Sequence, residues 1–174
     1  LGLADDRRVL ALLRALERVS PWQGNILLKL LPQAFVYLNR PSVMAIVDDI
    51  VRPALTERPC VVVGHSLGTV VTFKLLRDEL GVRVPFYLTI GSPLTVAAFK
   101  NAIGPIFARP DSVTTWLNGL DRDDAATLGR GLDETTFGPG IENVDNIDNG
   151  DTEPHAARMY LRDQKIAEAL ARAL

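Results

Sequence analysis

Residues 64–68 have the sequence GHSLG and follow a run of three valines at residues 61–63. A serine framed by glycines in this way, after a buried strand and before a helix, is typical of a nucleophile elbow. Such an elbow is a tight turn, and we expect no room for a Cβ atom at either Gly64 or Gly68. We also expect a strained backbone at Ser66 that lifts its hydroxyl above the sheet. These residues predict that Ser66 is a nucleophile.

A serine nucleophile needs a base that removes its proton, and the base needs a carboxylate that orients it. The chain contains 2 histidines, His65 and His155. His65 lies inside the elbow, where we expect it to pack beside the sheet in a structural role. His155 is therefore the expected base. It follows Pro154 where we expect a helix to begin, and the positive end of a helix dipole keeps an imidazole neutral and ready to accept a proton.

A cluster of three aspartates, at positions 121, 123 and 124, lies between the serine and this histidine in the sequence. The serine, the aspartates and the histidine each lie at or just beyond the carboxyl end of an expected strand. Open α/β sheets bind their ligands at this edge. Ser92 follows Gly91 at the end of another expected strand, and we expect it to form a turn near the pocket without a chemical role.

Four segments of the chain resemble, in order, bacterial esterases and lipases of the α/β-hydrolase superfamily. They are GHSLGT at residues 64–69, LTIGSPL at residues 88–94, WLNGLDRDD at residues 116–124, and Pro154-His155 with Tyr160 behind it. The resemblance covers roughly residues 58–174. It implies that these residues form the end of a hydrolase sheet with its catalytic groups.

The resemblance also suggests which aspartate is the catalytic acid. It is usually the second aspartate of an Asp-x-x-Asp segment, which is Asp124 in this chain. Relatives commonly continue with Pro-Val where this chain has Ala125-Ala126, so Asp121 is the alternative acid and Asp123 the third choice. The implied reaction is hydrolysis of a small-molecule acyl ester through an acyl-enzyme, with no cofactor and no metal. A non-catalytic hydrolase-like binding module and an acyltransferase with the same triad are the alternatives.

An oxyanion hole needs two donors, and the backbone N–H of Leu67, directly after the nucleophile, is the first. The second usually comes from a loop after an early strand, often marked by His-Gly. Residues 1–57 contain no such loop and are expected to be helical. We therefore expect the missing strands upstream of Leu1. The alternatives are a second chain that completes the sheet and a degenerate relative of the family that lacks these strands.

The expected elements alternate between strand and helix after residue 58. Helices are expected at residues 3–19, 25–38 with a kink at Pro32, 42–55, 67–80 closed by Gly81, and 164–174. Strands are expected at residues 60–63, 84–90, 113–117 and 141–147. This order predicts an α/β fold with a parallel sheet flanked by helices. The resemblance implies that this is the C-terminal portion of an α/β-hydrolase sheet, with a helical cap-like N-terminal region. Two domains are expected, residues 1–57 and 58–174. The apolar residues 26–38 suit either a cap over an acyl pocket or a core helix.

The composition excludes several other classes of protein. A net charge of −2 and an aromatic content of 6% argue against a nucleic-acid partner. The single cysteine, Cys60, excludes an internal disulfide and is expected to be a small buried hydrophobe. The acidic residues of 142–151 do not fit a calcium loop, because Ile147 stands where an oxygen ligand is needed. No apolar segment has membrane-spanning length, and the location is left open with a slight preference for the cytoplasm.

Overall fold

The fold was obtained as a computed structural model that describes residues 32–34, 36–55, 58–79, 81–96, 99–100, 103–104 and 107–174. The expected helix at residues 3–19, and the first part of the one at 25–38, lie outside the described residues. Residues 32–34 and 36–39 are helical, as expected for the second part. The cap or core role of this segment stays a prediction.

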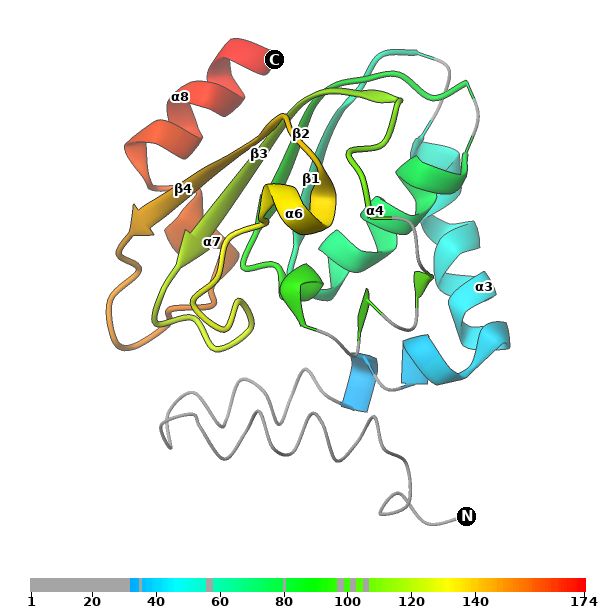
Figure 1. The fold of residues 1–174 in the computed structure, drawn as a ribbon, viewed down its shortest axis with the longest axis horizontal. Helices are drawn as coiled ribbons and strands as arrows, with labels where there is room; N and C mark the ends of the chain where they lie inside the picture. The colour runs from blue at the N-terminus through cyan, green and yellow to red at the C-terminus, as the bar shows by residue number, and fades with distance from the viewer. Residues whose placement is uncertain are drawn as a thin grey trace.

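In the described part of the chain, four parallel strands form one sheet in the order β1-β2-β3-β4 (Figure 1). They are β1 (Val61–His65), β2 (Val84–Ile90), β3 (Val113–Asp121) and β4 (Ile141–Ile147). The 12-residue helix α4 (Leu67–Asp78) follows β1, and α8 (Gln164–Ala173) closes the chain. The α/β class with a parallel sheet flanked by helices is therefore confirmed. Since all four strands run in the same direction, their carboxyl ends meet at one edge.

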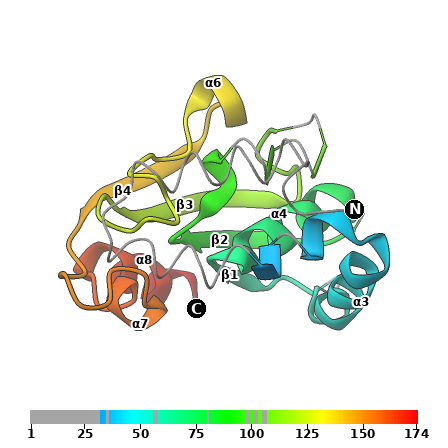
Figure 2. The same ribbon diagram turned by 90° about the horizontal axis from the view of Figure 1, so that it is seen from below.

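Each face of the sheet carries its own apolar core, because alternate side chains of a strand point to opposite faces. Helices α3 (Pro41–Val51) and α4 lie on one side, whereas α7 (Ala157–Tyr160) and α8 lie on the other (Figures 1 and 2). The core on the α4 side contains Phe73, Tyr87, Trp116 and Phe137. The core on the α8 side contains Phe86, Leu88, Ile90, Leu117, Tyr160 and Ile166.

Strand β4 does not alternate in its apolar residues, and its register explains why. Gly119 of β3 pairs with Val144, but Asp121 pairs with Ile147, so β4 has one extra residue between these two pairs. This irregularity returns Ile147 to the same face as Val144, and both pack in the core on the α8 side. Ile141 packs against the other core. The spacing of three residues is thus compatible with a strand.

Some element ends differ from the expectation. Helix α4 ends at Asp78 with Glu79 as its C-cap, so the expected closure by Gly81 is wrong.

Strand β3 continues beyond residue 117 because its polar residues find partners across the sheet. The Oγ1 of Thr89 donates to Asn118 Oδ1 at 2.8 Å, and Asn118 Nδ2 donates to Asn143 Oδ1 at 2.9 Å. The expected helix at 42–55 divides into α3 and a short 3-10 helix, Arg52–Ala54.

Helix α3 is attached to α4 by a buried aspartate. Asp48, 3% exposed, accepts hydrogen bonds from the hydroxyl of Tyr37 at 3.0 Å and from Nζ of Lys74 at 2.7 Å. Burial and the charge of Asp48 raise the pKa of Tyr37. The predicted boundary between a domain of residues 1–57 and a domain of residues 58–174 stays a prediction.

Strand β1 carries the serine turn at the border of the described sheet. Within the described residues, β1 pairs with β2 only. Val63 at its centre is 44% exposed, although strands of parallel sheets are usually buried on both faces. That further strands complete the sheet, from upstream or from a second chain, stays a prediction.

Candidate active site

Ser66 lies between the last residue of β1 and the first residue of α4, with φ 54° and ψ −129°. A positive φ at a residue with a Cβ is strained and persists only where neighbouring contacts hold it. The Ser66 N–H donates to Ile90 O at 3.1 Å. The Ser66 carbonyl accepts from the backbone N–H of Thr69 at 3.0 Å and from its Oγ1 at 2.7 Å. The expected strained elbow conformation is therefore present.

The two glycines of the GHSLG stretch differ in the space around them. A Cβ atom on Gly64 would lie 2.9 Å from Thr72 Oγ1 and 3.0 Å from Thr69 Cα, so only glycine fits without movement. A Cβ atom on Gly68 would meet nothing within 4 Å. The expectation that both positions are too tight is confirmed for Gly64 and wrong for Gly68. Gly68 is already the second residue of α4, where its side-chain position faces open space.

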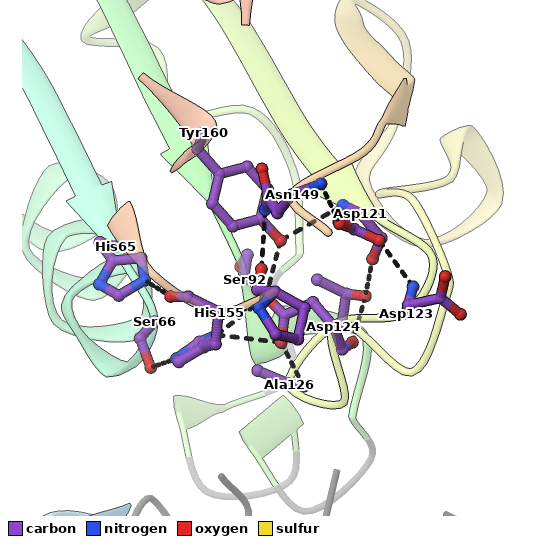
Figure 3. A network of polar contacts seen from close by, with 12 residues as sticks. His65, Ser66, Ser92, Asp121, Asp123, Asp124, Ala126, Asn149, His155 and Tyr160 are labelled. Atoms are coloured by element: carbon purple, nitrogen blue, oxygen red, sulfur yellow. Dashed lines mark hydrogen bonds and ion pairs between the residues drawn. The ribbon is translucent and has the colours of Figure 1, made fainter. Parts of the chain in front are cut away.

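The structure brings Ser66, His155 and Asp124 together in one hydrogen-bonded series (Figure 3). His155 Nε2 lies 2.8 Å from Ser66 Oγ, and His155 Nδ1 lies 2.8 Å from Asp124 Oδ2. A carboxylate only accepts hydrogen bonds, so Nδ1 carries the proton. In this tautomer Nε2 accepts the hydroxyl proton of Ser66. The imidazole is thus oriented to act as a base toward the serine.

Asp124 is fully buried and has donors for both carboxylate oxygens. Besides His155, it accepts from Ala126 N–H at Oδ1, 2.9 Å, and from Tyr160 hydroxyl at Oδ2, 2.6 Å. Tyr160 is buried too, and burial together with the charge of Asp124 raises its pKa. The tyrosine is therefore a hydrogen-bond donor at any ordinary pH. Tyr160 was part of the sequence motif, but its contact with Asp124 was missed because only the fold brings α7 next to the carboxylate.

Asp121, the alternative acid, has different partners. Its carboxylate accepts from the backbone N–H of Asp123 at 2.8 Å and from that of Asn149 at 2.7 Å. Burial raises the pKa of Asp121. Asn149 Nδ2 in turn donates to Pro154 O at 2.7 Å. Asp121 and Asn149 thus support the loop that carries His155, a role that the sequence did not indicate.

His65, the other histidine of the chain, contacts His155. His65 Nε2 lies 2.8 Å from the carbonyl oxygen of His155, and the two ring centroids are 4.7 Å apart. A carbonyl oxygen is an acceptor, so His65 Nε2 carries the proton and donates. Burial and the neighbouring His155 lower the pKa of His65, which keeps the ring neutral at neutral pH.

Gly91, at the end of β2, supplies space for the Asp124–His155 pair. A Cβ atom there would lie 2.9 Å from Asp124 Oδ2 and 3.2 Å from His155 Nδ1. The backbone φ of 55° is also one that glycine adopts most readily. Ser92 is buried, and its Oγ lies 2.8 Å from Thr69 Oγ1 and accepts from Leu94 N–H. Sequence reasoning placed this turn near the pocket, but it did not indicate that Gly91 leaves room for the Asp124–His155 pair.

Helix α4 provides one backbone donor beside the serine. Leu67 is its first residue, and the first N–H groups of a helix have no acceptor within the helix. This N–H is therefore free to bind a developing negative charge next to Ser66. The elements described before β1 are helical, and the expected second oxyanion donor stays a prediction.

The described part of the chain has neither a cluster of metal-ligating side chains nor a helix that could cross a membrane. It contains no group of three or more His, Cys, Asp or Glu side chains that would hold a metal ion. Nor does any helix within it have the length and apolar character needed to cross a membrane. Comparison of the chain with models of protein families, with curated proteins and with solved structures finds no match.

Proposed function

We propose that this chain is a serine hydrolase of the α/β-hydrolase type that cleaves carboxylic esters. Ser66 is the nucleophile, His155 the general base and Asp124 the residue that orients the base. The observation that carries the proposal is the series of hydrogen bonds from Ser66 Oγ through His155 to Asp124, 2.8 Å at each step. The strained elbow and the burial of Asp124 support it further.

Acylation begins when Ser66 Oγ attacks the carbonyl carbon of the ester and His155 Nε2 takes the hydroxyl proton. Asp124 stabilises the imidazolium that forms. The N–H of Leu67 donates to the oxyanion of the tetrahedral intermediate. When the C–O bond breaks, the imidazolium returns the proton to the leaving alkoxide. The alcohol departs and the acyl group stays on Ser66 as an ester.

Deacylation repeats these steps with water as the nucleophile. His155 Nε2 takes a proton from water as the oxygen attacks the acyl carbon. The second tetrahedral intermediate then expels Ser66 Oγ, which regains the proton from His155. The carboxylic acid leaves and the triad returns to its starting state.

The proposal is tested with p-nitrophenyl acetate, butyrate and decanoate and with a fluorophosphonate probe. Ser66→Ala is expected to lower turnover by at least about a thousandfold and to abolish labelling, because the nucleophile is lost. Ser112→Ala is the matched control. The Ser112 hydroxyl donates to Leu76 O at 3.0 Å and takes no part in the triad, so full activity is expected.

Three results contradict the proposal or parts of it. Equal activity of the wild type and Ser66→Ala contradicts the role of Ser66. An unlabelled and inactive wild type favours the non-catalytic binding module. Transfer of the acyl group to an added alcohol in place of release to water identifies an acyltransferase with the same triad.

A further inference from the structure

His155 belongs to an irregular segment and not to a helix or strand. Strand β4 ends at Ile147 and α7 begins at Ala157. A base on such a segment needs contacts that fix its backbone, because a displacement of about 1 Å lowers catalysis about a hundredfold. Asn149 provides one contact, through its hydrogen bond to Pro154 O. The next carbonyl along the chain is that of His155 itself.

His65 binds that carbonyl. Its Nε2 lies 2.8 Å from His155 O, while Nε2 of His155 lies 2.8 Å from Oγ of Ser66. Two consecutive residues of the elbow thus contact both the backbone and the ring of the same histidine. Movement of the segment away from β1 must break both contacts.

We propose that His65 is a positioning residue, whose Nε2–H holds the backbone of His155 so that the general base stays within reach of Ser66. The inference rests on the proposed hydrolase function. The ring of His65 does not touch the reacting atoms and acts only through His155.

The hydrogen bond from His65 to the carbonyl of His155 has its largest effect after acylation. Once Ser66 Oγ is bonded to the acyl carbon, it has no proton to donate to His155 Nε2. Two of the hydrogen bonds described above then still orient His155, from its Nδ1 to Asp124 and from His65 Nε2 to its carbonyl. We therefore expect the loss of the His65 donor to slow deacylation more than acylation.

A neutral His65 suits this role. Burial and the nearby His155 lower the pKa of His65, so its donor is present without a second positive charge. A charged ring whose centroid is 4.7 Å from that of His155 would oppose the imidazolium that forms during catalysis.

The test compares His65→Gln, which keeps an N–H donor at similar reach, with His65→Phe, which keeps a ring and removes the donor. Rapid mixing with p-nitrophenyl acetate separates the burst of acylation from the steady rate of deacylation. His65→Phe is expected to lower the steady rate roughly tenfold or more, with a smaller effect on the burst rate. His65→Gln is expected to stay within about threefold of the wild type, because hydrogen bonding to the carbonyl is restored. A His65→Phe protein as fast as the wild type overturns the inference, as does a His65→Gln protein as slow as His65→Phe.

A measurement on the wild type applies even where a variant fails to fold. The chain has 2 histidines, so ¹⁵N spectra of the imidazole rings contain two sets of signals, and a His155→Gln variant shows which set belongs to His65. The inference requires the Nε2–H tautomer at His65, and an Nδ1–H tautomer there overturns it. An inactive, unlabelled wild type with the Nε2–H tautomer contradicts the proposed function but leaves the contact between the two histidines in place.

Discussion

Two buried aspartates of this chain each accept a hydrogen bond from a buried tyrosine, yet their surroundings differ. Asp48 has Tyr37 and Lys74 as partners and attaches α3 to α4. Asp124 has Tyr160 and His155 as partners and lies in the candidate triad. Each carboxylate would be costly to bury without its donors. The two tyrosines therefore allow a matched comparison at the scale of a single hydroxyl.

Tyr160→Phe is expected to lower kcat/KM on the order of tenfold, because Asp124 loses a charge-assisted donor at 2.6 Å and orients His155 less well. The variant also leaves the N–H of Asp121 without its partner, the Tyr160 oxygen at 3.2 Å. Stability is expected to fall by about 1–3 kcal/mol. Ester hydrolysis and urea unfolding measure the two effects.

Tyr37→Phe is the control for this prediction. It removes the Tyr37 hydroxyl, which donates to Asp48 at 3.0 Å. The variant is expected to lower stability by a similar amount while leaving kcat/KM unchanged. Equal losses of activity in the two variants would mean that destabilisation alone explains the effect of Tyr160→Phe.

At the scale of elements, the site is assembled from the carboxyl ends of adjacent parallel strands. Ser66 follows β1, Gly91 follows β2, and Asp124 lies three residues after the end of β3. His155 comes from the segment after β4. The short distance between strand ends makes the contacts between these residues possible, and it also makes the site sensitive to added volume at Gly91.

Gly91→Ala is expected to lower turnover by at least about a hundredfold, because its Cβ would lie 2.9 Å from Asp124 Oδ2 and 3.2 Å from His155 Nδ1. The positive φ adds strain to this variant. Hydrolysis of p-nitrophenyl acetate measures the loss.

Gly68→Ala is the matched glycine substitution. Its Cβ meets nothing within 4 Å, and alanine favours the helix by roughly 0.5–1 kcal/mol. We expect a fold at least as stable as the wild type in urea unfolding. Full turnover of Gly91→Ala, or a clearly destabilised Gly68→Ala, would contradict the predicted difference between these glycines.

At the scale of the whole molecule, the sheet separates two cores, and the site lies at the edge where both end. Tyr160 belongs to the core on the α8 side, whereas Leu67 and α4 pack on the other side. The site therefore depends on both layers being in place. His65 connects the sheet to the segment before α7, since it lies on β1 and contacts the carbonyl oxygen of His155.

The stability of the whole protein is expected to fall as the pH is lowered, partly because of His65. Its pKa in the folded state is below the 6.5 of an exposed histidine. The unfolded chain therefore binds a proton there more readily, so this part of the stability is complete above pH 6.5 and is lost as the pH falls through the folded-state value.

Urea unfolding of the wild type and of His65→Gln at pH 7.5, 6.5 and 5.5 tests this expectation. Glutamine does not titrate, so the variant is expected to lose less of its unfolding free energy between about pH 7.5 and 5.5 than the wild type. Parallel losses in the two proteins would show that His65 is not protonated differently in the folded and unfolded states.

Much of the fold was predictable because apolar patterns are local. Residues 84–90 and 141–147 were expected to be strands and are strands. The end of β3 was not predictable, because Asn118 belongs to a strand only through partners on two neighbouring strands. The closure of α4 by Gly81 was wrong for a related reason, since a residue type common at helix ends does not by itself determine where a helix ends.

The residues of the candidate site likewise include some that were predictable from local sequence and some whose contacts depend on the tertiary structure. The candidate nucleophile was predictable from the sequence alone, because the GHSLG turn is a short local pattern, and so was the candidate base, because the chain has one histidine outside that turn. Three contacts depend on the tertiary structure: His155 contacts Asp124 and not Asp121, Tyr160 donates to Asp124, and His65 binds the backbone of His155. These contacts join residues 31 to 90 positions apart, and hydrogen bonds of that kind exist only once parallel strands have brought their ends to a common edge.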